Sequence, residues 1–257
     1  MIAPAACLAV LAERSILPPH RHAVYIAGSL IRGWGNHTSD LDVYVVSGSP
    51  WRGAVTASSP VSAIPGTVPV NAFYVDDRRW DVEYWSNPQV DDLLERVSWQ
   101  AFNAQQAAGN LGLTETLFIN RLSHCQIVEG GDWVKERRRQ FEESAARVIV
   151  ASQALYLLDH YTEDAVGMRA NNDMNSAVLA ARQALGFAVD ALLASHGELE
   201  TQPKWRARRM REVLPSELSY DEYWDLETMR SYDKDAPERW VDEVLLLCQR
   251  IAAAVNL

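Results

Sequence analysis

Short apolar runs in the first third of the chain have the length and alternation that predict β-strands. A helix is expected before them, over 5–16. Asp76 and Asp77 stand between the last two runs and predict a hairpin turn, while the Pro-, Ser- and Gly-rich stretch over 47–66 predicts a long loop. The expected strands lie at 23–27 (AVYIA), 41–46 (LDVYVV), 69–75 (PVNAFYV) and 80–85 (WDVEYW).

From residue 88 onward, apolar residues recur at helical spacing. Pro88 suits the start of a helix, and Val90, Leu93 and Val97 after it share one face. Further helices are expected at 114–124, 132–158, 173–195, 204–213 and 237–255, with another short one starting near 219–222. The pattern therefore predicts an α+β fold. A small mixed sheet flanked by helices is expected over residues 1–130, followed by an α-helical domain over 131–257.

The composition is that of an ordinary globular protein. The chain has 257 residues, of which 48% are hydrophobic and 23% charged, enough for a core in one large or two small domains. Its formal net charge of −10 argues against duplex nucleic acid as a partner, because phosphate backbones are bound by Lys and Arg. A small-molecule substrate suits such a chain better.

The cysteines and the N-terminal residues favour a cytoplasmic location. Cys7, Cys125 and Cys248 are widely spaced and match no zinc or redox motif, which is typical of a reducing compartment. The short apolar run near the N-terminus has no basic region before it, so we expect no signal peptide. We also expect no membrane span, which would need about 18 apolar residues in a row.

A Gly-Ser pair follows the first expected strand, in the segment YIAGSLIRGWGNHTSDLDVYVV over 25–46. Gly28 has no Cβ atom, so backbone amides there can come close to the phosphates of a ligand. Ser29 adds a hydroxyl donor. In the loop that follows, Ser39 is a further candidate phosphate-binding residue, and Arg32 could either contact a phosphate or stabilise the loop.

Two carboxylates begin the second expected strand. Asp40 and Asp42 are two residues apart, so on a strand both point to one face and repel each other unless a cation lies between them. Mg²⁺ prefers such hard oxygen ligands and often completes its shell with substrate phosphates. On a later strand, Asp81 and Glu83 are two candidates for a third carboxylate. Three carboxylates can hold two Mg²⁺ ions for an in-line displacement at the α-phosphorus of a nucleotide.

This combination resembles the signature of the DNA polymerase β-like nucleotidyltransferase superfamily: a Gly-Ser pair, a loop, an Asp-x-Asp and a third acid on a later strand. The kanamycin-type antibiotic nucleotidyltransferases are the most similar members. They also have nine residues between the Gly-Ser and Ser-Asp pairs, and a third acid in a Trp-x-Val-Glu context, matched here by 80–83. The resemblance covers residues 23–86 and implies a nucleotidyltransferase fold in domain 1–130. It favours Glu83 over Asp81 as the third Mg²⁺ ligand, beside Asp40 and Asp42.

Two roles are less firmly placed by the sequence. Helical domains in this superfamily often present a basic residue to the nucleotide, and Lys204, at the start of the basic stretch 204–211, could reach the triphosphate; the alternative is a solvated helix face. A hydroxyl acceptor also needs a general base. The resemblance implies a glutamate, with Glu115 and Glu129 as candidates.

The expected function is transfer of a nucleoside monophosphate from an NTP to a small-molecule acceptor, with Mg²⁺ as cofactor and pyrophosphate as the leaving group. The acceptor can be an antibiotic or an intermediate of natural-product biosynthesis. An antitoxin-type protein adenylyltransferase and a catalytically inactive nucleotide-binding relative are the alternatives. Partners other than the substrates are not expected, apart from a second copy of the chain in a homodimer.

Overall fold

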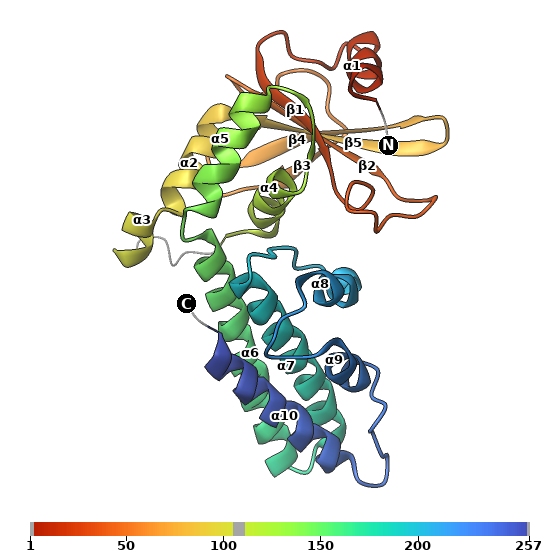
Figure 1. The fold of residues 1–257 in the computed structure, drawn as a ribbon, viewed down its shortest axis with the longest axis vertical. Coiled ribbons are helices and arrows are strands. Elements are labelled where there is room, and N and C mark those ends of the chain that lie inside the picture. The colour runs from red at the N-terminus through yellow and green to blue at the C-terminus, as the bar shows by residue number, and fades with distance from the viewer. Residues whose placement is uncertain (1–2, 105–110, 256–257) are drawn as a thin grey trace. The chain divides into compact units, whose positions relative to one another are not determined.

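The computed structural model describes residues 3–104 and 111–255 (Figure 1). The chain forms two compact units, Met1–Ala145 and Ala146–Leu257. The first contains a sheet with helices, and the described part of the second is helical. The sequence placed a domain boundary after residue 130. That position lies inside the first unit, because helix α5 (Gly131–Glu142) packs against other elements of this unit. They are strands β1 (Arg21–Ala27) and β6 (Gln126–Glu129) and helix α4 (Leu113–Ser123).

Six strands form one sheet in the order β3-β4-β5-β2-β1-β6. The β2–β5 pair is parallel, and the other pairs are antiparallel. The expected hairpin turn joins β4 to β5, where Asp76 and Asp77 both have positive φ. Two strands were not foreseen: β3 lies within the expected long loop, and β6 follows the expected helix over 114–124. The strands are β1 (Arg21–Ala27), β2 (Leu41–Ser47), β3 (Ala57–Pro60), β4 (Thr67–Val75), β5 (Arg78–Ser86) and β6 (Gln126–Glu129).

The two faces of the sheet differ in chemistry. One face is apolar and packs under α1 (Pro4–Glu13), with Cys7 and Leu11 of that helix in contact with alternate residues of the central strands such as Val43 and Val82. The other face carries aromatic and acidic residues. There the rings of Tyr25 and Tyr44 stack with centroids 5.0 Å apart. Because side chains alternate along a strand, the apolar core on one face leaves the opposite face free for polar groups.

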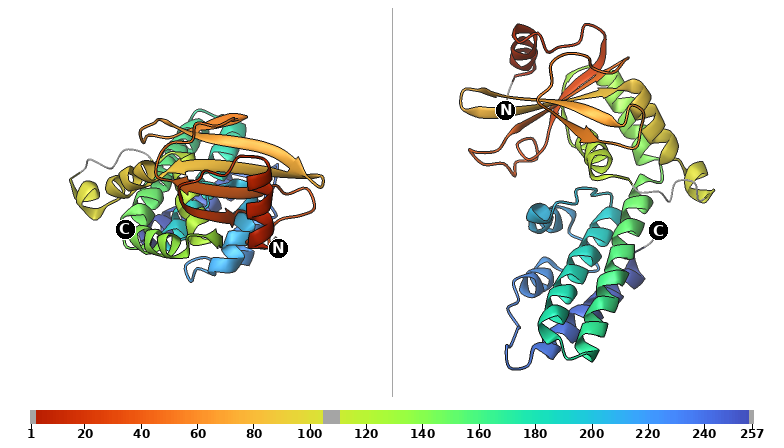
Figure 2. Two further views of the ribbon diagram at one scale, coloured as in Figure 1. Left: turned by 90° about the horizontal axis from the view of Figure 1, so that it is seen from above. Right: turned by 180° about the vertical axis from the view of Figure 1, so that it is seen from behind.

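Helices cover the polar face of the sheet (Figure 2). Phe118 of α4 lies 4.2 Å from the ring of Trp85 on β5, measured between centroids, and also meets Phe141 of α5. Ser86 and Gln89 form a capping box that starts α2, immediately after β5. The additional helices of this unit are α2 (Asn87–Arg96), α3 (Trp99–Asn103) and α4 (Leu113–Ser123).

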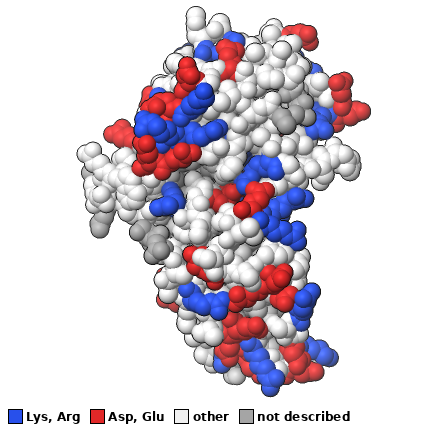
Figure 3. All heavy atoms as spheres, viewed as in Figure 1, with Lys and Arg blue, Asp and Glu red and all other residues white. Residues whose placement is uncertain are grey.

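The helix expected over 132–158 is two helices, α5 and α6 (Ala146–Ala170). The first ends where the hydroxyl of Ser144 donates a hydrogen bond to the carbonyl of Phe141 at 2.7 Å. The amide of Ala145 then leaves the helical pattern and donates to the carbonyl of Val97 at 2.8 Å. On the surface of α5, Arg139 pairs with Glu136 and Glu143, and acidic and basic side chains are interspersed over this region (Figure 3).

Helix α7 (Met174–Ser195) is the core of the second unit and packs on α6 and α10 (Pro237–Ala254). The N-cap of α7 is Asp173, whose carboxylate accepts from the amide of Ser176 at 3.1 Å. Among the described residues, α7 alone is long and apolar enough to cross a membrane, which the sequence had not led us to expect; 78% of that window is buried inside the structure. Smaller elements complete the unit: a 3₁₀ helix η1 (Pro203–Trp205), α8 (Arg206–Val213) and α9 (Tyr220–Glu227).

Candidate active site

The turn after β1 lies directly against β2. Gly28 follows the last residue of β1 and has φ of +81°, a conformation that favours glycine. A Cβ atom at this position would lie 1.9 Å from Oδ2 of Asp42. The closeness follows from strand register, since Ala27 pairs with Asp42. The chain therefore brings the Gly-Ser turn and the Asp-x-Asp pair together, and only a residue without a side chain fits between them.

Asp42 forms an ion pair with Arg121, in the last turn of α4. Its Oδ2 atom lies 2.7 Å from Nη1 of Arg121, and the two side chains are 25% and 12% exposed. Burial raises the pKa of Asp42 above its ordinary value, and the charges of Asp81 and Asp40 add to the rise, while Arg121 opposes it. Asp42 is thus a half-buried carboxylate that faces both a cation and two further acids.

The third-acid candidates occupy different positions along β5. Asp81 is the direct partner of Asp42 in the parallel register, so both side chains point to the same face. Glu83 lies two residues further along the strand, on the same face as Asp81 and opposite Tyr44. Asp81 forms a salt bridge of 2.8 Å with Arg79, which itself is 46% exposed.

Glu83 is held by two hydrogen bonds. Tyr44 donates its hydroxyl to Oε1 at 3.2 Å, and Trp85 donates Nε1–H to Oε2 at 3.1 Å. Burial raises the pKa of Glu83, and these donors together with the charge of Arg121 oppose the rise. Each carboxylate oxygen of Glu83 therefore already has a protein donor.

The acids fit Mg²⁺ in one binding mode and not in another. Among the described residues, no three His, Cys, Asp or Glu side chains are grouped closely enough to hold a metal ion between them. A cage of three carboxylates is therefore not preformed. Mg²⁺ is also bound through one or two carboxylates together with substrate phosphates. Asp42 and its neighbouring acids offer the hard oxygen ligands for that mode, and the Gly28 turn lies directly beside Asp42.

The other residues of the loop are held in local interactions. The carbonyl of Ser29 accepts hydrogen bonds from the amides of Trp34 and Gly35, at 2.8 and 2.9 Å, which folds the loop back on itself. The guanidinium of Arg32 lies 3.6 Å from the ring centroid of Trp34. The hydroxyl of Ser39 accepts from the amide of Asn36 at 2.9 Å. The roles of Ser29, Arg32 and Ser39 in phosphate binding stay predictions.

The two general-base candidates have structural partners. Glu115 is fully buried and accepts hydrogen bonds from the amides of Ser62 and Gly112, both at 2.9 Å, as well as from Arg96. These contacts fix the start of α4, and they leave Glu115 inaccessible to a substrate. Glu129 forms a salt bridge of 2.6 Å with Arg21.

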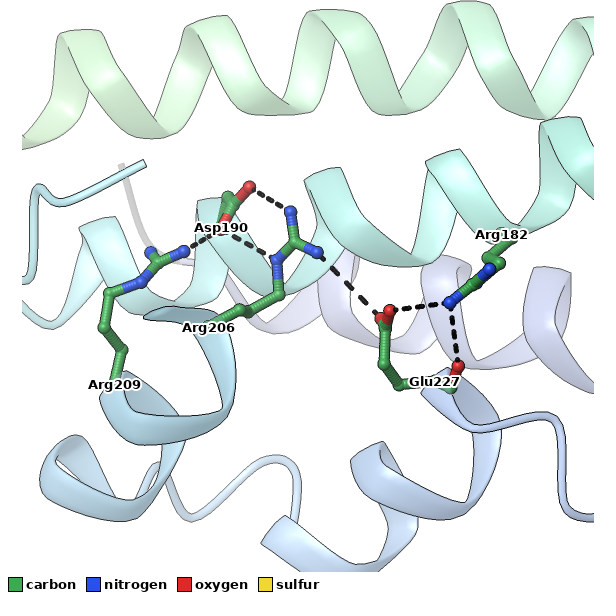
Figure 4. Close-up of polar contacts among 5 residues, drawn as sticks. All are labelled: Arg182, Asp190, Arg206, Arg209 and Glu227. Carbon is green, nitrogen blue, oxygen red and sulfur yellow. Dashed lines mark hydrogen bonds and ion pairs between the residues drawn. The ribbon is translucent and has the colours of Figure 1, made fainter. Parts of the chain in front are cut away.

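The basic stretch of the second unit is only partly a solvated helix face: Lys204, Arg208 and Arg211 are exposed, and Arg206 and Arg209 are buried. Arg206 donates two hydrogen bonds to Asp190 of α7, at 3.1 and 2.8 Å, and Arg209 donates a third at 2.6 Å (Figure 4). All three residues are buried, and Arg209 is 0% exposed. These arginines therefore hold α8 to α7. Lys204 is exposed in η1, with Nζ 5.3 Å from the ring centroid of Trp205, and its phosphate-binding role stays a prediction.

Sequence reasoning missed Arg121 as a residue of the site. It lies in an expected helix, 114–124, with no motif around it, and its approach to Asp42 depends on how α4 packs over the sheet. One signal could have raised the question: paired acids on one strand face need a cation nearby, and a basic residue on a covering helix can supply it.

Comparisons with known proteins concern the fold. No protein-family model matches the chain, and no curated protein sequence does either. Among solved structures, the chain is similar to a nucleotidyltransferase-like protein from Exiguobacterium sibiricum 255-15, with a TM-score of 0.53 at 12% sequence identity. The similarity covers 98% of this chain and 74% of that one. The chain therefore has a nucleotidyltransferase-like fold.

Proposed function

We propose that the protein is a Mg²⁺-dependent nucleotidyltransferase that moves a nucleoside monophosphate from an NTP to a hydroxyl, or a similar group, of a small-molecule acceptor. The likeness of the fold and the resemblance to kanamycin-type enzymes over residues 23–86 both support the reaction class. We further propose that the acceptor is an antibiotic or a related natural product.

The close contact between Gly28 and Asp42 carries the proposal. A turn that could hold phosphates lies beside a carboxylate that could hold a metal ion. The two act together only on a ligand that carries both phosphates and a metal ion. A metal-bound nucleoside triphosphate is such a ligand. A Cβ atom on Gly28 would lie 1.9 Å from Oδ2 of Asp42, so only a glycine lets the turn lie this close to the carboxylate.

The residues divide the work of the reaction. Gly28 and Ser29 hold the triphosphate, and Asp40 and Asp42 hold the metal with Asp81 or Glu83. When bound, Mg²⁺ supplies charge neutralisation to the phosphates and to the leaving group. The acceptor oxygen forms a bond to the α-phosphorus, the bond from that phosphorus to the β-phosphate oxygen breaks, and pyrophosphate leaves. The acceptor's proton passes to a base.

A thermal-shift panel tests nucleotide binding first. ATP, GTP, CTP and UTP are each added with and without Mg²⁺ to the wild-type protein and to Asp42→Asn. We expect one NTP to raise the melting temperature only with Mg²⁺, since a ligand at a hundredfold excess over its Kd stabilises the folded state by about 2.7 kcal/mol. The nearly isosteric variant should lose this shift. Pyrophosphate release with that NTP and a panel of aminoglycosides then tests the transfer itself.

A catalytically inactive nucleotide-binding protein is the second candidate. Two observations favour it: Arg121 already pairs with Asp42, and no three acids among the described residues form a metal cage. In that case an NTP binds without pyrophosphate release for any acceptor, and its binding persists in Asp42→Asn. Nucleotide binding that depends on Mg²⁺ and on Asp42 argues for the enzyme.

A further inference from the structure

Arg121 lies where the two halves of the candidate site meet. Its Nη1 atom is 2.7 Å from Oδ2 of Asp42, and the same atom would lie 2.7 Å from a Cβ atom placed on Gly28. One guanidinium thus touches the metal-binding candidate and borders the turn that would hold phosphates. The side chain is 12% exposed, so it is enclosed by the site.

The charge of Arg121 acts on three side chains of this face. Burial raises the pKa of Asp42, Glu83 and Tyr44, and the charge of Arg121 opposes the rise in each. Neighbouring cations face other groups: Arg79 pairs with Asp81, and Arg138 of α5 donates to the carbonyl of Leu122. Arg121 therefore neutralises the negative charge of Asp42.

A divalent cation and Arg121 need the same oxygen. Oδ2 of Asp42, at 2.7 Å from Nη1 of Arg121, is engaged in an ion pair with the guanidinium. A metal ion bound at Asp42 makes that pairing redundant and places a second positive charge beside the guanidinium, which then repels it. The guanidinium is planar and rich in donors, which suits phosphate oxygens as well as carboxylates. Since it already borders Gly28, it needs little movement to exchange one anion for the other.

We propose that Arg121 is an exchangeable cation of the site. It neutralises Asp42 while no metal ion is bound, and it contacts the phosphates of the nucleotide when Asp42 binds the metal. The phosphate half of this inference rests on the proposed function, whereas competition between Arg121 and a metal ion at Asp42 does not. Arg121 thus binds the nucleotide, and it also opposes metal binding at Asp42 while no nucleotide is bound.

Two binding titrations on Arg121→Gln test the exchange. In the first, Mn²⁺ alone is titrated and its free fraction is measured by electron paramagnetic resonance. Removal of the competing cation should tighten Mn²⁺ binding, on the order of tenfold, because the ion pair with Asp42 no longer has to be broken. In the second, the NTP identified by thermal shift is titrated at saturating Mg²⁺ by calorimetry. Its affinity should fall on the order of tenfold, as expected for loss of one charge-assisted hydrogen bond to phosphate.

Matched variants separate exchange from a merely structural role. Arg138→Gln removes another anchor of the end of α4 without touching Asp42, and it should leave both affinities unchanged. Arg121→Lys keeps the charge, so its Mn²⁺ affinity should stay near that of the wild type. Arg121→Met, a second neutral variant, serves if Arg121→Gln does not fold. Unchanged Mn²⁺ affinity in Arg121→Gln overturns the competition. An equal gain in Mn²⁺ affinity in Arg138→Gln overturns it as well.

The nucleotide titration has its own decisive outcome. Unchanged NTP affinity in Arg121→Gln overturns the phosphate contact. If the wild-type protein binds no NTP under any condition, the proposed function and the phosphate half fall together. The Mn²⁺ titration still decides in that case whether Arg121 competes at Asp42, so the two failures are distinguishable.

Discussion

Asp42 of β2 and Asp81 of β5 are direct partners across the parallel strand pair, with their side chains on the same face. In this register Asp81 lies nearer to Asp42 than Glu83 does, although the sequence resemblance favours Glu83. The two acids also differ in their partners. Asp81 faces an arginine that is itself 46% exposed, whereas both oxygens of Glu83 have protein donors.

From this relationship we expect Asp81→Asn to weaken Mg²⁺-dependent nucleotide binding more than Glu83→Gln does. The second change should instead lower the free energy of unfolding by about 1 kcal/mol, because a Gln amide has one acceptor atom, so either Tyr44 or Trp85 loses its partner. Thermal shifts over a Mg²⁺ series and urea unfolding measure the two effects. The opposite pattern, with Mg²⁺ dependence lost in Glu83→Gln and kept in Asp81→Asn, would identify Glu83 as the third ligand.

Gly28 and Gly33 provide a matched pair for testing the close approach in the turn. Both have positive φ, +81° and +69°, so alanine is strained at each by about 1–2 kcal/mol. At Gly33 a Cβ atom would meet nothing within 4 Å, while at Gly28 it would overlap Asp42. We expect Gly28→Ala to be clearly the less stable variant in urea and to lose nucleotide binding, and Gly33→Ala to keep it. Equal losses of stability would mean that backbone strain alone matters.

The raised pKa of Asp42 predicts a pH dependence of stability. An acid whose pKa is higher in the folded state than in the unfolded state, where it is about 3.9, keeps its proton longer on folding. Its contribution is fully present below the unfolded value and is lost as the pH rises through the folded value. The free energy of unfolding should therefore fall over this window in metal-free buffer, and less so in Asp42→Asn. Urea unfolding between pH 3 and 7 measures both slopes; parallel curves would assign the dependence to other groups.

The shared carboxylate of Asp190 predicts a large effect in the second unit. Two buried arginines, Arg206 and Arg209, pair with it. Asp190→Asn removes this carboxylate from the fully buried Arg209, while Arg206 keeps Glu227 at 3.9 Å. Removal of one partner from a buried ion pair costs about 3–5 kcal/mol. The exposed pair of Asp242 and Arg169 in the same unit is the control, and Asp242→Asn should cost about 1 kcal/mol or less. Calorimetric unfolding distinguishes them, and similar costs for both variants would contradict the prediction.

Buried cysteines report on each unit separately. Burial raises the pKa of Cys7 in the first unit to about 11 and that of Cys248 in the second to about 12. At pH 8 neither is a reactive thiolate in the folded protein. We expect an alkylating reagent to modify each only after its own unit unfolds. Peptide mass spectrometry across a urea series gives two labelling midpoints, which should differ if the units unfold independently; coincident midpoints would show one cooperative transition.

Much of the fold and part of the site could be predicted from local patterns. The strands at 23–27, 41–46, 69–75 and 80–85 follow from alternation and apolar runs, and the fold class follows from their order. The short edge strands β3 and β6 lack that pattern and exist through pairing with β4 and β1. The pairing of Arg121 with Asp42 could not be foreseen either, because it joins residues far apart in sequence. For the same reason the basic stretch 204–211 was not recognised as partly buried.

The boundary between the two units at Ala145 has a consequence for how the gene can evolve by recombination. Each unit is one uninterrupted stretch, with its own buried core, and the chain crosses between them once. A recombination event at that junction would exchange a whole helical unit without cutting either core or separating Gly28, Asp42 and Arg121 from one another. Genes that recombine there can vary the helical second unit, while the residues proposed for the chemistry stay together in the first unit.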